Sequence, residues 1–331
     1  MIKEIQKYLF NAIKHKKNHH SEYKNIFNHL SSIKIIPIQN KSKQSQITSY
    51  SRNIQSQFMS KNISQSIQSF NYQSQTKFQI NHCSVAINIY SETDNDKFSE
   101  EIIPVIHYMI CLFPNNQKNT ITVNYYLSDE KKEFPEDSSF LGVDNVNSGY
   151  CSIGSTDCEI TIYRKEEIVK VTIHELIHGL HNVSLSDTDD VIQFYQNRYN
   201  ISSQNVKIDE AYTEIWANII NCFILSLEFK GKEYETFIQF LAMEQLFCQI
   251  QANKIMNHTN MMDQIIDLNK HTNVLAYYII RCEIFQNLSG FLKYCREKNR
   301  NYIQINNEND WHIFFKQQNN ITKQSISEPP V

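Results

Sequence analysis

The sequence predicts an α+β fold in which strands occupy the first part of the chain and helices the second. Apolar and polar residues alternate over residues 85–90 and again over 121–126, which is the period of a strand. Residues 158–163 predict a third, short strand. After Glu166 the apolar residues recur at helical spacing, and they continue to do so through Tyr294. We therefore expect a sheet with an early helix, followed by a mainly helical second half.

Composition divides the chain into four parts. Residues 1–38 predict an N-terminal helical segment. Residues 39–77 are dominated by Ser, Gln, Asn and Lys without steady periodicity, which predicts a low-complexity linker or flexible arm. Residues 78–316 carry the periodic patterns and form the expected folded domain. Residues 317–331 are polar and end in two prolines and a valine, which predicts a disordered tail.

Local signals place the helix ends and the longer loops. An apolar helix is expected over residues 99–113, but its start is open because Pro104 is tolerated only in the first turn. Residues 128–144 are mostly polar and predict a loop. The helix after the third strand is expected to end near Gly179, because glycine favours a C-terminal cap. A further helix is expected over 208–229.

The charge balance and the apolar runs exclude several classes of protein. Lys and Arg number 32 and Asp and Glu 35, for a net charge of −3, so we expect no nucleic-acid partner. No apolar run reaches the roughly 18–20 residues that span a bilayer, so we expect no membrane segment. The lysine-rich first 30 residues lack the apolar region of a secretory signal. The six glycines form no GxGxxG fingerprint of dinucleotide binding.

The eight cysteines contain no CxxC pair. Several lie in apolar helical patterns, where cysteine behaves as a small hydrophobic residue. Together with the missing signal, this indicates an intracellular, reduced protein. A bridge between Cys151 and Cys158 remains open.

The pattern His174-Glu175-Leu176-Ile177-His178 carries the chemistry. Residues four apart share a helix face, so both imidazoles can bind one Zn²⁺ at about 2.0–2.1 Å. Glu175 is rotated about 100° from His174 and lies beside the metal's open position, where it can take a proton from bound water. The alternative is an ordinary core or surface helix, in which these polar side chains are hydrogen-bonded and bind no metal.

A catalytic zinc site needs a third protein ligand. Glu210 and Glu214 lie one turn apart at the start of the helix expected from residue 208. We assign Glu210 as the ligand and Glu214 as the residue that orients a zinc-bound histidine through its outer ring nitrogen. The reverse assignment stays open. So does a third interpretation, in which Asp209 and Glu210 only complement the helix dipole.

These two helices resemble the gluzincin metallopeptidases, which combine HExxH with a glutamate and a second acidic residue four positions later. A closer resemblance, from about Val146 to Tyr278, is to a metallopeptidase family of large DNA viruses. The matching segments are Asn147-Ser148-Gly149, Tyr163-Arg164-Lys165-Glu166-Glu167, Lys170-Val171, Glu210-Ala211-Tyr212-Thr213-Glu214-Ile215-Trp216-Ala217, and Thr272 with Tyr277-Tyr278. The resemblance implies a zincin-like fold with a small mixed sheet, an active-site helix and a zinc peptidase activity. Residues 1–77 fall outside it.

The expected mechanism uses zinc-bound water activated by Glu175, which then protonates the leaving amine. A donor must stabilise the oxyanion, and Tyr277, Tyr278, His271 and His181 are candidates. In enzymes of the gluzincin pattern, a Tyr or His from the later helical part often serves. On that resemblance we favour Tyr278.

The expected partner is a protein or peptide substrate, lying extended along a sheet edge. The segment Val146–Cys151 is either that edge strand or a plain loop. An alternative function is a catalytically silent, zinc-stabilised structural or interaction protein of a virus particle. Hydrolysis of a non-peptide amide is a third option. The expected location is intracellular, in host cytoplasm or virion, and the oligomeric state stays open.

Overall fold

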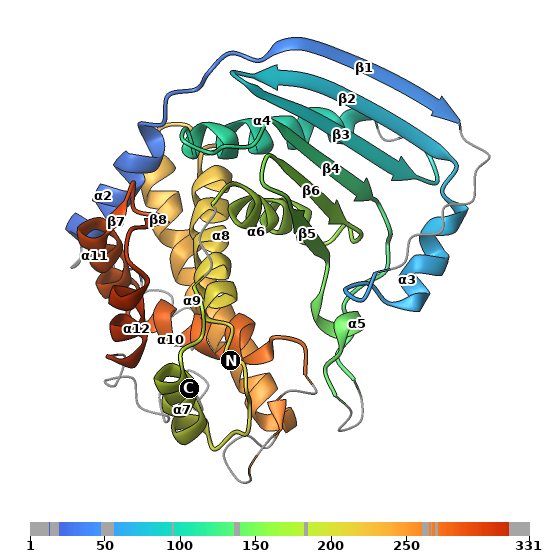
Figure 1. Cartoon of the computed structure of the whole chain (residues 1–331). Coiled ribbons are helices and arrows are strands. Elements are labelled where there is room, and N and C mark those ends of the chain that lie inside the picture. Colours follow the sequence, from blue (N-terminus) through green and yellow to red (C-terminus); the bar gives the residue numbers. More distant parts are fainter. Residues whose placement is uncertain are drawn as a thin grey trace. The chain divides into compact units, whose positions relative to one another are not determined.

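Figure 1 shows a computed structural model of the chain, which describes residues 13, 20–47, 56–94, 96–135, 140–181, 185–259, 265, 267–268 and 271–317. The predicted tail beyond residue 317 and most of the first 19 residues lie outside this range. By internal contacts the chain divides into two units, here called the helical unit and the sheet unit. The helical unit comprises Met1–Ser32, Glu136–Phe140 and Val183–Val331, and the sheet unit comprises Ile33–Pro135 and Leu141–Asn182. The four-part organisation predicted from composition stays a prediction.

The sheet unit is built on a six-stranded mixed sheet in the order β1-β2-β3-β4-β6-β5 (Figure 1). Its strands are β1 Gln39–Ile47, β2 Tyr72–Ile80, β3 Cys83–Ser91, β4 Thr120–Tyr126, β5 Gly149–Ile153 and β6 Asp157–Ile162. The strands β3, β4 and β6 run parallel, while β1, β2 and β3 are successively antiparallel and β5 is antiparallel to β6. The fold is therefore mixed α and β, as the sequence predicts.

Alternation along the strands separates an apolar face from a polar one. Ile87, Val123 and Ile160 lie on the first face and are fully buried. The helices α4 (Asp96–Leu112) and α6 (Ile168–Leu180) lie on the same side of the sheet (Figure 1). This burial removes aliphatic surface from water and supplies the main stabilisation of the unit. The opposite face carries amides, with Asn88 donating to Asn124 at 2.8 Å.

Residues 39–77, expected as a linker or arm, contribute β1, the first part of β2, the helix α3 (Lys61–Ser66) and the short helix η1 (Ile67–Ser69). β1 is an edge strand, and its described side chains are exposed. A strand that buries neither face needs no apolar alternation, so its composition resembles low-complexity sequence. Side-chain amides also pair across it, as in Gln46 Nε2 to Gln73 Oε1 at 3.3 Å.

Two other local predictions differ from the structure. Pro104 lies well inside α4, which begins several residues earlier than the pattern indicated. Gly179 is inside α6, and the C-terminal cap is His181. The loop predicted over 128–144 contains the start of the one-turn helix α5 (Val143–Val146) and is otherwise irregular where described.

The helical unit packs its helices around an aromatic core. Its described helices are α2 His20–Ser31, α7 Asp189–Tyr199, α8 Ile208–Ser226, α9 Glu233–Thr259, the π-helix Leu275–Ile280, α10 Arg281–Gln286, α11 Leu288–Lys298 and α12 Glu308–Lys316. A two-stranded ladder pairs β7 (Asn299–Arg300) with β8 (Gln304–Ile305). Trp216, Phe291 and Trp311 are fully buried, and their rings meet at 5.7–5.8 Å. The helix expected over 208–229 is thus confirmed as α8.

Candidate metal centre

The helix α6 carries the HExxH pattern through the interior of the sheet unit. It contacts both β5 and β6. His174 is 6% exposed and Glu175 7% exposed, so both polar side chains are buried. Buried polar groups of this kind need partners, because desolvation without compensation is costly. Position on a core helix also limits the orientations that each side chain can take.

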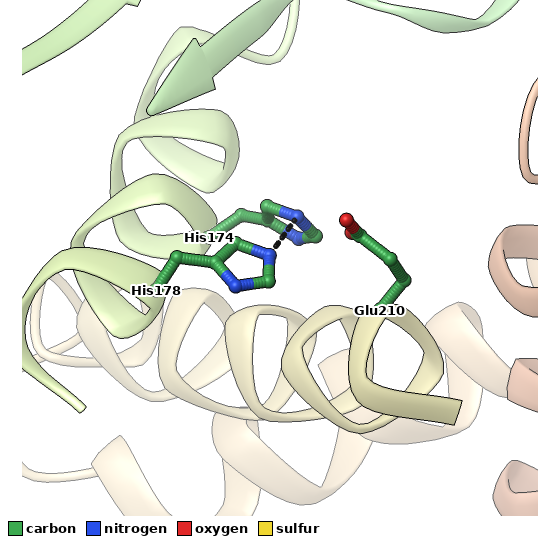
Figure 2. A group of neighbouring side chains, drawn as sticks. All are labelled: His174, His178 and Glu210. Carbon is green, nitrogen blue, oxygen red and sulfur yellow. Dashed lines mark hydrogen bonds between the residues drawn. The ribbon is translucent and has the colours of Figure 1, made fainter. Parts of the chain in front are cut away.

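The two imidazoles of α6 face each other. His174 Nε2 and His178 Nε2 are 3.2 Å apart, and the ring centroids are 4.9 Å apart (Figure 2). The spacing of one helical turn brings the rings together, as predicted from the sequence. Two nitrogens at this distance can share a proton in a hydrogen bond or bind a common cation.

The N-terminus of helix α8 is capped by a side chain from outside the helix, that of Asp187. The carboxylate of Asp187 accepts hydrogen bonds from the backbone N–H groups of Val206, Lys207 and Ile208, at 2.6, 2.8 and 3.1 Å. These donors would otherwise lack intrahelical partners, and a carboxylate also complements the positive end of the helix dipole. Asp187 therefore holds the turn of α8 that carries Glu210.

Glu210 is half-buried in the first turn of α8 and is held by a tyrosine. The hydroxyl of Tyr277 donates to Glu210 Oε2 at 2.9 Å. Tyr277 belongs to the π-helix Leu275–Ile280, whose wider turns are often found at functional sites. The contact orients the carboxylate of Glu210 through one of its two oxygens.

Glu214, one turn further along α8, is buried in an ion pair. Arg281 Nη1 donates to Glu214 Oε1 at 2.8 Å, and both side chains are about 5% exposed. A second carboxylate, that of Glu244, lies 3.9 Å from the same guanidinium nitrogen. The predicted role of Glu214 beside a metal-bound histidine stays a prediction, and its observed partner is a cation from α10.

The candidates for oxyanion stabilisation have different surroundings. Tyr278 is half-buried, and the guanidinium of Arg281 lies 5.8 Å from its ring centroid. His271 packs its ring against Phe140 at 5.3 Å, and burial lowers its pKa. His181 is buried against the ring of Phe113 at 6.0 Å. The hydroxyl of Tyr277 donates to Glu210, a predicted metal ligand.

The structure groups three possible metal ligands. One donor atom each from His174, His178 and Glu210 lies within 4.8 Å of the others, the one such group among the described residues (Figure 2). The sequence assigns the same three residues as metal ligands, and that assignment stays a prediction. The imidazoles belong to the sheet unit and Glu210 to the helical unit. Joint binding of one ion by all three is therefore a proposal, which is developed below.

The edge strand β5 resolves an alternative that the sequence left open. Residues Gly149–Ile153 form β5, which pairs with β6 and is the last strand of the sheet on that side. Asn147 and Ser148 precede the strand and are not part of it. The predicted segment is therefore an edge strand from Gly149 onward.

Two contacts in the helical unit escaped sequence reasoning. They are the cap that Asp187 forms at the start of α8 and the ion pair between Arg281 and Glu214. Arg281 lies between the apolar residues Ile279, Ile280 and Cys282. An arginine in such a run is expected to be buried and therefore to need an acidic partner. No comparable local signal marks Asp187, because its partners lie about 20 residues later.

The comparisons with known proteins give one distant likeness. The chain is 23% identical over 259 residues, 70% of its length, to a protein of Acanthamoeba polyphaga mimivirus described as uncharacterized. The match spans 65% of that relative, less than two thirds of it. No family model and no solved structure matches the chain. Among the described residues, no helix combines the length and apolar character needed to cross a membrane.

Proposed function

We propose that the protein is a zinc-dependent peptidase of gluzincin type, with a zincin-like sheet unit. His174, His178 and Glu210 would hold the metal, and Glu175 would act as general base. The proposal also places the protein inside the host cell or the virus particle, and the viral origin of the mimivirus relative is in keeping with this.

The observation that carries the proposal is the spacing of the two imidazoles. Nitrogens bound to one tetrahedral Zn²⁺ at about 2.0–2.1 Å stand roughly 3.3 Å apart, since they enclose the tetrahedral angle. His174 Nε2 and His178 Nε2 are 3.2 Å apart. The rings thus already have the separation that a shared zinc ion requires, and the carboxylate of Glu210 supplies a hard third donor.

When bound, zinc would polarise a substrate carbonyl and lower the pKa of a coordinated water toward 7. The residues of the chain divide the remaining work. Glu175 follows His174 on a buried turn and accepts the proton of the attacking water, then passes it to the leaving amine. Tyr277 orients Glu210. Tyr278 remains our candidate for stabilising the oxyanion.

The edge strand β5 supports a peptide as the substrate. An edge strand presents unpaired backbone N–H and C=O groups, to which an extended peptide can add as a further strand. β5 contacts α6, the helix that carries the histidines and Glu175. A peptide on this edge would therefore run close to the general base.

The test is the variant Glu175→Gln, which keeps the shape of the side chain but cannot accept a proton. We expect hydrolysis of a peptide library, followed by mass spectrometry, to fall by about 10²–10⁴-fold. Zinc content measured by elemental analysis should equal that of the wild type. The double variant His174→Ala with His178→Ala should lose both zinc and activity.

The outcomes separate the alternatives. If the wild type and Glu175→Gln both bind zinc but the wild type cleaves no peptide, the protein is a zinc-stabilised structural protein and the peptidase proposal is wrong. Cleavage of small amides but not of peptides would point to a non-peptide amidase. Full peptidase activity in metal-free protein would contradict the zinc mechanism.

A further inference from the structure

Two cysteine thiols meet in the sheet unit beside α6. Cys151 Sγ on β5 and Cys158 Sγ on β6 are 3.3 Å apart, within reach of a hydrogen bond between sulfurs. Both are free thiols in the structure. Cys158 is buried, whereas Cys151 is half-buried and so partly accessible to solvent.

The strand register brings the two thiols together. Cys151 pairs with Ile160, and Cys158 lies two residues away on β6, so both side chains point to the same face of the sheet. The helix α6 covers this face, and the backbone of Gly179 lies close to the two thiols. A Cβ at position 179 would collide with Cys158 Sγ and lie 3.7 Å from Cys151 Sγ. The absence of a side chain there makes room for both sulfurs.

The charges around the pair favour one thiolate. The hydrogen bond from the Cys151 thiol lowers the pKa of Cys158, and the ammonium of the buried Lys118 acts in the same direction. The same sulfur–sulfur hydrogen bond and burial raise the pKa of Cys151. Lys118 is held in place by donating to the carbonyl of Gly154, in the turn between β5 and β6. Burial of Cys158, followed by the carboxylates of Glu175 and Asp157, acts against this lowering of its pKa.

We propose that Cys151 and Cys158 form a redox-active pair that a peroxide oxidises to a reversible disulfide. The proposal rests on the sheet unit alone and is independent of the zinc site. Three features of the structure support it: the contact between the sulfurs, the neighbouring Lys118 ammonium, and the partial exposure of Cys151.

The reaction balances with hydrogen peroxide as the oxidant. The Cys158 thiol ionises, and its thiolate attacks one peroxide oxygen. An S–O bond forms, the O–O bond breaks, and the departing hydroxide takes up the proton that the thiol released, which gives water. The sulfur of Cys151 then attacks the sulfenic acid. The S–S bond forms, the S–O bond breaks, and the departing hydroxide takes the Cys151 proton to give a second water. Two thiols lose two electrons in total, and the peroxide gains them.

Closing the bond changes the packing beneath α6. The sulfurs must move from 3.3 Å to about 2.05 Å, which draws β5 and β6 together next to Gly179. Diagonal neighbours on antiparallel strands are farther apart than a relaxed disulfide prefers. The bond should therefore be reduced easily by a small thiol, as expected for a regulatory bridge.

The experiment treats the full-length protein with equimolar hydrogen peroxide and then blocks the remaining thiols under denaturing conditions. We expect the number of titratable thiols to fall by two from the eight in the sequence. Peptide mapping should recover Cys151 linked to Cys158, and dithiothreitol should restore both thiols. In the variant Cys151→Ser, a sulfenic acid on Cys158 should be trapped by dimedone.

The matched control is Cys83→Ser, which removes a buried cysteine from β3 in the same unit. It should form the bridge as the wild type does. Retention of both thiols at tenfold excess peroxide would overturn the proposal. So would a bridge from Cys158 to Cys83.

Discussion

The helices α6 and α8 carry the residues that we propose as metal ligands, and each helix holds its polar residues by different means. α6 buries His174 and Glu175 and packs closely on β5 and β6 at Gly179, which has no side chain. α8 holds its acidic residues with charge and hydrogen bonds, from Asp187 at its start and Arg281 at Glu214. Shape complementarity positions the imidazoles, whereas electrostatic pairing positions the carboxylates.

The largest effect on stability is expected where charge is buried. Arg281→Met removes the guanidinium that pairs with the buried Glu214. We expect the free energy of unfolding, measured by urea denaturation, to fall by about 3–5 kcal/mol, because an ionised carboxylate is left in an apolar site.

Two controls sharpen this prediction. The double variant Arg281→Met with Glu214→Gln should recover most of the loss, because no charge is then buried. Lys165→Met, which breaks an exposed ion pair with Asp129 in the sheet unit, should cost under about 1 kcal/mol. A similar cost for both single variants would show that burial does not set the strength of these pairs.

A smaller effect is expected where packing positions the helix. Gly179→Ala adds a Cβ that collides with Cys158 Sγ, and overpacking of this kind typically costs about 1–3 kcal/mol. In a Cys158→Ala background the sulfur is gone, so the same substitution should stabilise the protein by up to about 1 kcal/mol, because alanine is a better helix former than glycine. Thermal and urea unfolding of the four proteins measure both changes. The same sign in both backgrounds would refute a role for the sulfur contact.

The smallest effect is expected at the hydrogen bond that orients Glu210. Tyr277→Phe removes the hydroxyl that donates to Glu210 Oε2. If Glu210 binds zinc as proposed, metal affinity should fall by about tenfold, the lower end of what loss of a ligand's hydrogen-bond partner produces. Competition with a chelating dye measures it, and Tyr278→Phe serves as the control. Equal losses in the two variants would mean that the Tyr277 contact has no special role.

The facing imidazoles of His174 and His178 could be predicted from the sequence, because helix geometry alone brings residues four apart to one face. The three strands around residues 85–90, 121–126 and 158–163 were recognised because one of their faces is apolar. The edge strand β1 was missed because it buries no face, so no alternation of apolar residues reveals it.

The sequence by itself determined that two imidazoles and a glutamate share one helix, since that follows from local periodicity. Only the tertiary structure decided that Tyr277 donates to Glu210 and that Arg281 pairs with Glu214. The physical reason is distance along the chain. Helical turns depend on neighbours three or four residues away, whereas each of these contacts joins residues 67 positions apart and depends on how whole elements pack.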